Sequence, residues 1–101
     1  MPQEQSNVKD RSRLKIEEPR KYTVVFHNDD FTPMAFVVAV LMGIFQLDYA
    51  KANHLMMDVH TKGKARVGSY SYDVAMTKAG RVTSTARLHR YPLKVTVEPQ
   101  S

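Results

Sequence analysis

Cysteine and tryptophan are both absent from this 101-residue chain, and no apolar run approaches the length that spans a membrane. Without cysteine the chain can form no disulfide, no zinc–thiolate site and no thiol nucleophile. Such a composition suits a reducing compartment. The first residues, Met1 to Gln5, lack the apolar core of a secretory signal. We therefore expect a cytoplasmic protein without membrane contact.

The charge balance raises the question of nucleic acid. The formal net charge is +5, from 15 basic and 10 acidic residues. These charges are spread along the chain, whereas a phosphate-binding face shows a basic stripe with aromatic residues or a known motif. We therefore interpret the excess as a solvated basic surface. A ribosome- or nucleic-acid-associated module stays as the alternative.

The length allows one domain, preceded by a polar extension. Before Pro19, only Val8, Leu14 and Ile16 are aliphatic, so this part cannot bury enough surface to offset the entropy of ordering. We expect a disordered extension over residues 1–20 and a folded core domain over residues 21–101.

The core alternates between strand and helix patterns. Strands are expected at Tyr22–Phe26, Lys64–Tyr70 and Leu93–Glu98, and helices at Pro33–Phe45, between Asp48 and Gly63, and from Ser71 to about His89. Thr32, Asp48 and Ser71 are placed to cap the three helices. The pattern predicts an α+β fold of order β-α-α-β-α-β, with a small antiparallel sheet covered on one side by helices.

Polar and apolar side chains are expected to meet where the first two helices adjoin. Short connections favour antiparallel helices, so the end of the second lies near the start of the first. His60 then approaches Asn28 and Asp29, and all three side chains can accept hydrogen bonds. The neighbouring apolar patch consists of Met34, Val37, Met56 and Val59. An apolar hole with an acceptor-rich rim suits a protonated α-amino group beside a bulky side chain.

These residues also carry a family resemblance. Residues 28–34 read Asn-Asp-Asp-Phe-Thr-Pro-Met, followed by Phe36-Val37, and residues 55–65 contain Leu-Met-x-x-Val-His-x-x-Gly-Lys-Ala. Val74-Ala75, Thr77-Lys78 and Pro92-Leu93 continue the pattern. Together the blocks resemble the bacterial ClpS adaptor family over about residues 22–98.

The resemblance implies a three-stranded antiparallel sheet packed on three helices, similar to the C-terminal domain of the ribosomal stalk protein. It implies an adaptor that binds the free N-terminus of N-degron substrates beginning with Leu, Phe, Tyr or Trp. The adaptor delivers them to a ClpA- or ClpC-type AAA+ chaperone for degradation by ClpP. No cofactor, metal, nucleic acid or membrane is implied, and we expect a monomer.

The family's site residues carry over position by position. Asn28, Asp29 and His60 match the residues that hold the α-amino group and the first peptide unit, and Asp30 and Thr32 match supports of the turn. The hydrophobic pocket is matched by Met34, Val37, Met56, Val59 and Leu93, with Thr32 at its wall and Met34 as the gatekeeper against β-branched first residues. Asp73 and Lys78 match the contact with the chaperone's N-terminal domain.

Three features depart from the family pattern. Ala35 stands where Glu is frequent, so the Thr-x-x-Glu capping box is lost. His27 stands where an apolar residue is usual, which bears on the edge of the pocket and its pH response. The extension is short, which bears on delivery rather than on binding.

Each of these residues also has a simpler interpretation. Met34 and Met56 could be ordinary core residues, and His60 could interact with the C-terminal end of a helix. His54 and Asp58 have the i, i+4 spacing of a metal pair, although two ligands without a third are weak evidence. Asp29, Asp30 and His60 could also be the acid–base site of an enzyme, but the sequence contains no cysteine, nucleophile elbow, phosphate loop or metal triad. We therefore predict a binding module rather than an enzyme.

Overall fold

The computed structural model describes residues 19–100, so the extension expected over residues 1–20 lies almost wholly outside the described part. The elements are β1 (Tyr22–His27), α2 (Met34–Gly43), α3 (Tyr49–Lys62), β2 (Lys64–Tyr70), α4 (Tyr72–Leu88) and β3 (Lys94–Pro99). This order confirms the predicted β-α-α-β-α-β arrangement.

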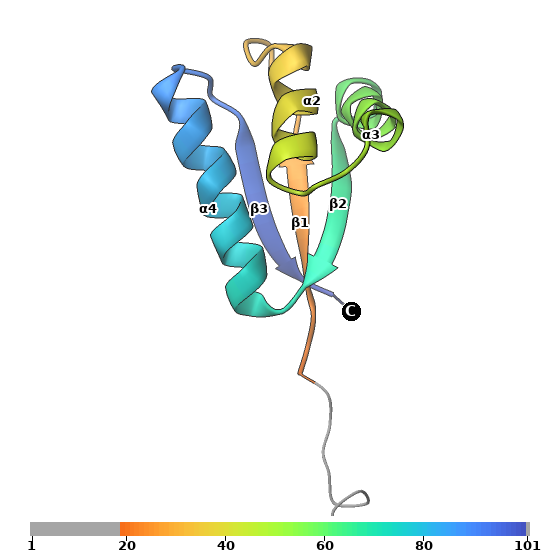
Figure 1. Ribbon diagram of the computed structural model, residues 1–101, viewed down its shortest axis with the longest axis vertical. Helices are drawn as coiled ribbons and strands as arrows, with labels where there is room; N and C mark the ends of the chain where they lie inside the picture. Colours follow the sequence, from red (N-terminus) through yellow and green to blue (C-terminus); the bar gives the residue numbers. More distant parts are fainter. Residues whose placement is uncertain (1–18, 101) are drawn as a thin grey trace, which may run out of the picture.

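The three strands form one antiparallel sheet in the order β2-β1-β3. All three helices lie over the same face of this sheet (Figure 1). Because side chains alternate along a strand, Val24 and Phe26 of β1 point into the core between sheet and helices. The opposite face carries Thr23, Val25 and His27 of β1, and no helix of residues 19–100 covers it.

His27 belongs to this open face of the sheet. Its Nε2 atom is hydrogen-bonded to Oγ1 of Thr96 over 2.8 Å. Burial lowers the pKa of His27, and the cationic side chains of Lys94 and Lys64 on the adjoining strands lower it further. The departure from the family pattern at this position therefore affects the open face of the sheet, and His27 does not line the predicted pocket.

The second and third helices begin at the predicted caps. The Asp48 carboxylate accepts from the Lys51 N–H, and the Ser71 hydroxyl accepts from the Val74 N–H. The prediction for the first helix was wrong: Pro33 is the N-cap of α2, and its backbone is extended. Thr32 provides no cap because its hydroxyl donates to a carboxylate oxygen of Asp29 instead.

The core lies between the helices and the covered face of the sheet. Its largest side chains that are almost fully buried are Phe26, Leu41, Leu93, Val24 and Val82. Val25 is also buried, but it lies on the opposite face of the sheet. Phe26 and Phe45 meet edge to face, with ring centroids 5.7 Å apart. This contact packs β1 against the segment that follows α2.

Candidate functional site

The turn between β1 and α2 is held by one carboxylate. One oxygen of Asp29 accepts from the N–H groups of Phe31 and Thr32, at 2.8 and 2.7 Å. The other oxygen accepts from the Thr32 hydroxyl at 2.8 Å. From the sequence we expected Asp30 and Thr32 to support this turn. Thr32 does so as a donor, but the carboxylate that accepts these hydrogen bonds is that of Asp29. Asp can make such bonds because its short side chain reaches the N–H groups two and three residues ahead.

The ionised form of Asp29 is favoured by these contacts. Burial by itself would raise the pKa of Asp29, since it disfavours the charged form. The hydrogen bonds from Thr32 and Phe31 outweigh burial, and the positive charge of Arg87 adds a smaller effect in the same direction. The pKa of Asp29 is therefore lowered, and the turn presents a negative charge at neutral pH.

The turn is joined directly to the end of α3. The backbone N–H of Asn28 donates to the carbonyl of Gly63 over 2.9 Å. Gly63 ends α3 with a φ of 93°, in the left-handed region that glycine adopts without a steric penalty. This reversal carries the chain from α3 into β2 and brings His60, in the last turn of α3, to the turn after β1.

A cavity of about 250 Å³ lies where these elements meet. It is lined by Asn28, Asp29, Asp30, Thr32, Met34, Val37, Met56, Val59 and His60. Its apolar floor is buried, with exposed fractions of 5% for Val37, 8% for Met56 and 4% for Val59. Its volume is below the roughly 300–1,000 Å³ of most small-molecule sites, so it fits one side chain with its backbone.

The structure thus brings together nine of the ten residues predicted for the peptide site. Leu93 is the exception: it is 1% exposed, belongs to the core cluster and does not line the cavity. Met34 is 43% exposed, which places it at the mouth of the cavity rather than in the core.

Arg87 is a residue that the sequence did not single out. Its guanidinium donates to the carbonyls of Tyr91 and Leu93, at 2.7 and 3.1 Å, and so holds the loop between α4 and β3. A lone arginine near the end of a helix carries no signal that distinguishes this role from a solvated surface charge.

Two larger hollows lie elsewhere. One, of about 380 Å³, lies on the open face of the sheet and is lined mostly by polar groups of Thr23, Arg66, Ser69, Glu98 and Gln100. The other, of about 490 Å³, lies between α4 and β3 and is mostly apolar. Of the three, the 250 Å³ cavity combines an apolar floor with a rim of acceptors that includes a carboxylate of lowered pKa.

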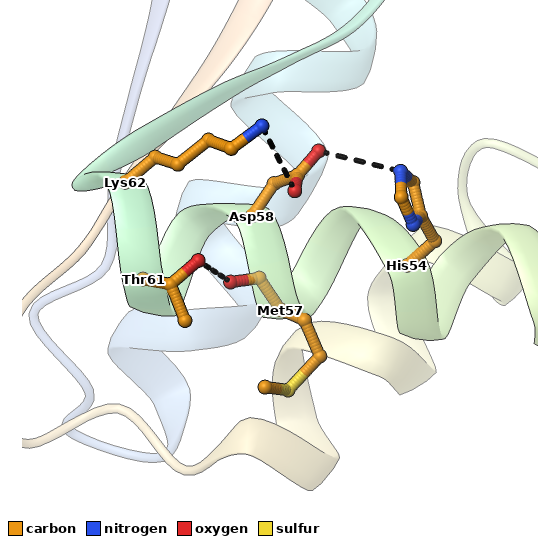
Figure 2. A network of polar contacts seen from close by, with 5 residues as sticks. All are labelled: His54, Met57, Asp58, Thr61 and Lys62. Carbon is orange, nitrogen blue, oxygen red and sulfur yellow. Dashed lines mark hydrogen bonds and ion pairs between the residues drawn. The ribbon is translucent and has the colours of Figure 1, made fainter.

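His54 and Asp58 belong to a network of polar contacts on α3 rather than to a recognisable metal site. The Asp58 carboxylate lies between His54, at 3.6 Å, and Lys62, at 3.5 Å (Figure 2). Within residues 19–100 no three His, Cys, Asp or Glu side chains are grouped so that they could hold a metal ion. An exposed i, i+4 ion pair such as that of Lys62 with Asp58 contributes about 0.3–0.5 kcal/mol to stability.

Asp73 and Lys78, the two predicted chaperone contacts, lie together on α4 at a shallow hollow shared with Val74, Thr77 and Arg81. Lys78 also has a structural role. Its Nζ donates to the carbonyl of Ile44, the C-cap of α2, over 3.0 Å. The same ammonium lies 5.6 Å from the ring centroids of both Phe45 and Tyr70.

Because of these contacts, Lys78→Met is expected to lower the free energy of unfolding by about 1–2 kcal/mol, from the lost hydrogen bond and cation–π contacts. Urea unfolding measures this change. Lys62→Met is the matched control, because it removes only an exposed ion pair and should cost less than about 0.5 kcal/mol. Equal losses in the two variants would show that the contacts of Lys78 contribute no stability of their own.

Comparisons with known proteins show which family the chain resembles in sequence and fold. The sequence profile of the family described as "ATP-dependent Clp protease adaptor protein ClpS" matches residues 17–96. The chain belongs to the ClpS family. It is 48% identical to the ATP-dependent Clp protease adapter protein ClpS of Hydrogenovibrio crunogenus over 96 residues, which cover 95% of this chain and 92% of that protein. It is 43% identical to ClpS of Vibrio atlanticus over 93 residues, covering 92% and 88%.

A solved ClpS structure extends the comparison to three dimensions. The structure of Agrobacterium tumefaciens ClpS2 bound to L-phenylalaninamide superposes with a TM-score of 0.80 at 36% identity. The match covers 82% of this chain and 100% of that chain. The family is thus shown by sequence and by fold, and it is a family of protease adaptors. Over residues 19–100, no helix of this ClpS family member is both long and apolar enough to cross a bilayer.

Proposed function

We propose that the cavity between α2 and α3 binds the free N-terminus of N-degron proteins whose first residue is Leu, Phe, Tyr or Trp. The chain then delivers them to a ClpA- or ClpC-type AAA+ chaperone for degradation by ClpP. One observation carries the proposal: an apolar cavity of single-side-chain size has a rim containing Asn28, Asp29 and His60. The ligand of the ClpS2 relative, an aromatic amino acid amide, supports it.

Two regions of the cavity bind different parts of the ligand. The apolar floor takes the first side chain, and burying a Leu or Phe contributes about 1.5–3 kcal/mol. The rim takes the α-amino group, which is a cationic donor, and each hydrogen bond to such a charge contributes about 1.5–3 kcal/mol. After the cost of association, two or three of these contacts give roughly micromolar affinity or somewhat tighter.

The proposal also assigns roles to the remaining predicted residues. Asp30 and Thr32 complete the rim, and Met34 at the mouth limits the shape of the first side chain. Asp73 and Lys78 on α4 contact the N-terminal domain of the chaperone. In this proposal the chain acts in the cytoplasm as an adaptor that binds and hands over substrates without catalysing their hydrolysis. The nucleic-acid alternative is not favoured, because the relatives are Clp protease adapters.

Fluorescence anisotropy with a labelled peptide that begins with Phe tests the proposal. The competitors are the same peptide with an acetylated N-terminus and a matched peptide that begins with Gly. We expect micromolar or tighter binding of the Phe peptide and at least tenfold weaker competition by both controls, about 1.4 kcal/mol or more. Binding that ignores acetylation would contradict capture of the α-amino group.

A further inference from the structure

The outer edge of β3 is unpaired within the described residues, because β3 is the last strand of the sheet. Beside this edge lies the apolar groove of about 490 Å³, formed by Met76, Ala79 and Gly80 of α4 and by Val95 and Val97 of β3. Met76 is 45% exposed. An open strand edge next to an apolar groove offers both backbone hydrogen bonds and a surface to bury.

Gly80 keeps this groove open. Glycine inside a helix costs about 1 kcal/mol relative to alanine, so it needs a reason. Packing among residues 19–100 gives no such reason, since a Cβ atom added at position 80 would meet no atom of these residues within 4 Å. The missing side chain instead leaves room for an approaching backbone or side chain from outside.

The charges on β3 identify what fits there. The strand reads Lys94-Val95-Thr96-Val97-Glu98, which is self-complementary about its middle residue. In an antiparallel pairing centred on Thr96, Lys94 lies opposite Glu98 of the second copy, and Val95 lies opposite Val97 of the second copy. Opposite charges directly across a pair of strands are attractive, whereas like charges are repulsive. We propose that β3 pairs in this register with β3 of a second copy, joining two sheets into one.

The twofold symmetry of this pairing accounts for the groove as well. An isologous interface places the same patch of both copies against each other. The two valines of each β3 and Met76 of each α4 then share one apolar seam, and Gly80 allows the two helices to approach. Pro99 cannot donate a hydrogen bond, so the ladder ends at Glu98. Five residues a side make a small contact, so the association is weak and reversible.

This pairing departs from the monomer that we expected from the sequence. Lysine and proline at a strand edge commonly discourage pairing with other chains. In this register, however, Lys94 meets an opposite charge instead of a like one. The lysine and proline of this edge therefore discourage pairing with strands of other sequences, but they do not discourage pairing with a second copy of β3.

Sedimentation equilibrium of the full chain tests the proposal at concentrations up to about 1 mM. The expected result is a mean mass that rises from the monomer toward the dimer. Amide NMR shifts should change with concentration in residues 76–83 and 94–98. Lys94→Glu should weaken association by about tenfold or more, because both charge pairs of the dimer become repulsive. Lys94→Glu combined with Glu98→Lys should restore it.

Two further variants test whether association depends on the β3 edge and its groove rather than on the net charge of the chain. Lys64→Glu makes the same charge change on β2, at the far edge of the sheet, and should leave association unchanged. Gly80→Leu fills the groove with a good helix former and should abolish association without loss of fold.

Three results would overturn the proposal. They are a monomer at all concentrations, an association insensitive to Lys94→Glu, and shifts that map to another surface. Protection of the outer β3 amides from hydrogen exchange at every concentration would also overturn it, because the edge would then be covered within one chain.

Discussion

Replacing Asp29 with alanine is expected to weaken binding of a free-amine Phe peptide by about tenfold to a hundredfold. The change removes the carboxylate of lowered pKa from the rim of the cavity. It also removes three hydrogen bonds that shape the turn. A charged hydrogen bond contributes about 1.5–3 kcal/mol, which corresponds to this range of affinity. Isothermal titration calorimetry of the variant and the parent measures the difference.

Two isosteric variants separate the charge of Asp29 from its role in the turn. Asp29→Asn keeps an oxygen that can accept from the N–H groups of Phe31 and Thr32, but it loses the negative charge. Asp30→Asn removes a second rim carboxylate that makes no hydrogen bond to the turn. If the charge of Asp29 holds the amine, Asp29→Asn should resemble Asp29→Ala, and Asp30→Asn should change affinity much less. A larger loss in Asp30→Asn would transfer the amine contact to Asp30.

The acid dependence of stability provides an independent check on Asp29. Its folded-state pKa is lowered relative to the unfolded chain, in which a carboxyl titrates near about 3.9. The contribution of Asp29 to the free energy of unfolding is therefore fully present above that pH. It is lost as the pH falls through the lower folded-state pKa. Urea unfolding should show the parent more stable than Asp29→Asn at pH 6, and this gap should narrow below pH 4.

Met34→Ala is expected to admit first residues that the parent rejects. Met34 lines the cavity and is 43% exposed, so its side chain narrows the mouth without being fixed in the core. Truncation removes three heavy atoms from the mouth, and β-branched Ile and Val then fit. A difference of one or two methylene-sized contacts is worth about 1–3 kcal/mol, so affinity for an Ile peptide should rise about tenfold to a hundredfold. Competition anisotropy with peptides beginning in Ile, Val, Leu and Phe measures the preference series.

Met42→Ala is the matched control for this change. Met42 lies on the same helix, is 39% exposed and does not line the cavity. The preference series of this variant should equal that of the parent. If Met34→Ala also left the series unchanged, the mouth of the cavity would have to be limited by another residue.

The pattern of the sequence was sufficient for the fold and for most of the cavity. The helical period of the apolar residues in α3 predicted that Met56 and Val59 share a face with His60. The short connection between the helices predicted that this face lies beside Met34 and Val37 of α2. These are local regularities, and the antiparallel packing of neighbouring helices follows from them.

Other features depended on contacts that no local pattern reveals. Two acids stand side by side at positions 29 and 30, and only the path of the backbone decides which of them reaches the N–H groups ahead. Thr32 is a residue type that commonly caps helices, but its hydroxyl donates to Asp29 instead. The N-cap position of α2 is therefore Pro33. Leu93 lies in the loop between α4 and β3, outside any periodic segment, so the apolar pattern does not decide between the core and the cavity wall.

The hydrogen bond from Asn28 to Gly63 joins two parts of the chain that are 35 residues apart. The rim of the cavity is divided in the same way, between the turn after β1 and the last turns of α3. A peptide that contacts both the turn after β1 and the end of α3 holds these two parts of the chain together. Such a peptide binds the folded chain but not the unfolded chain. By mass action, its binding adds to the free energy of unfolding, about 2.7 kcal/mol at a hundredfold excess over the dissociation constant. An adaptor of this design therefore resists unfolding best while it carries its cargo and least once it is empty.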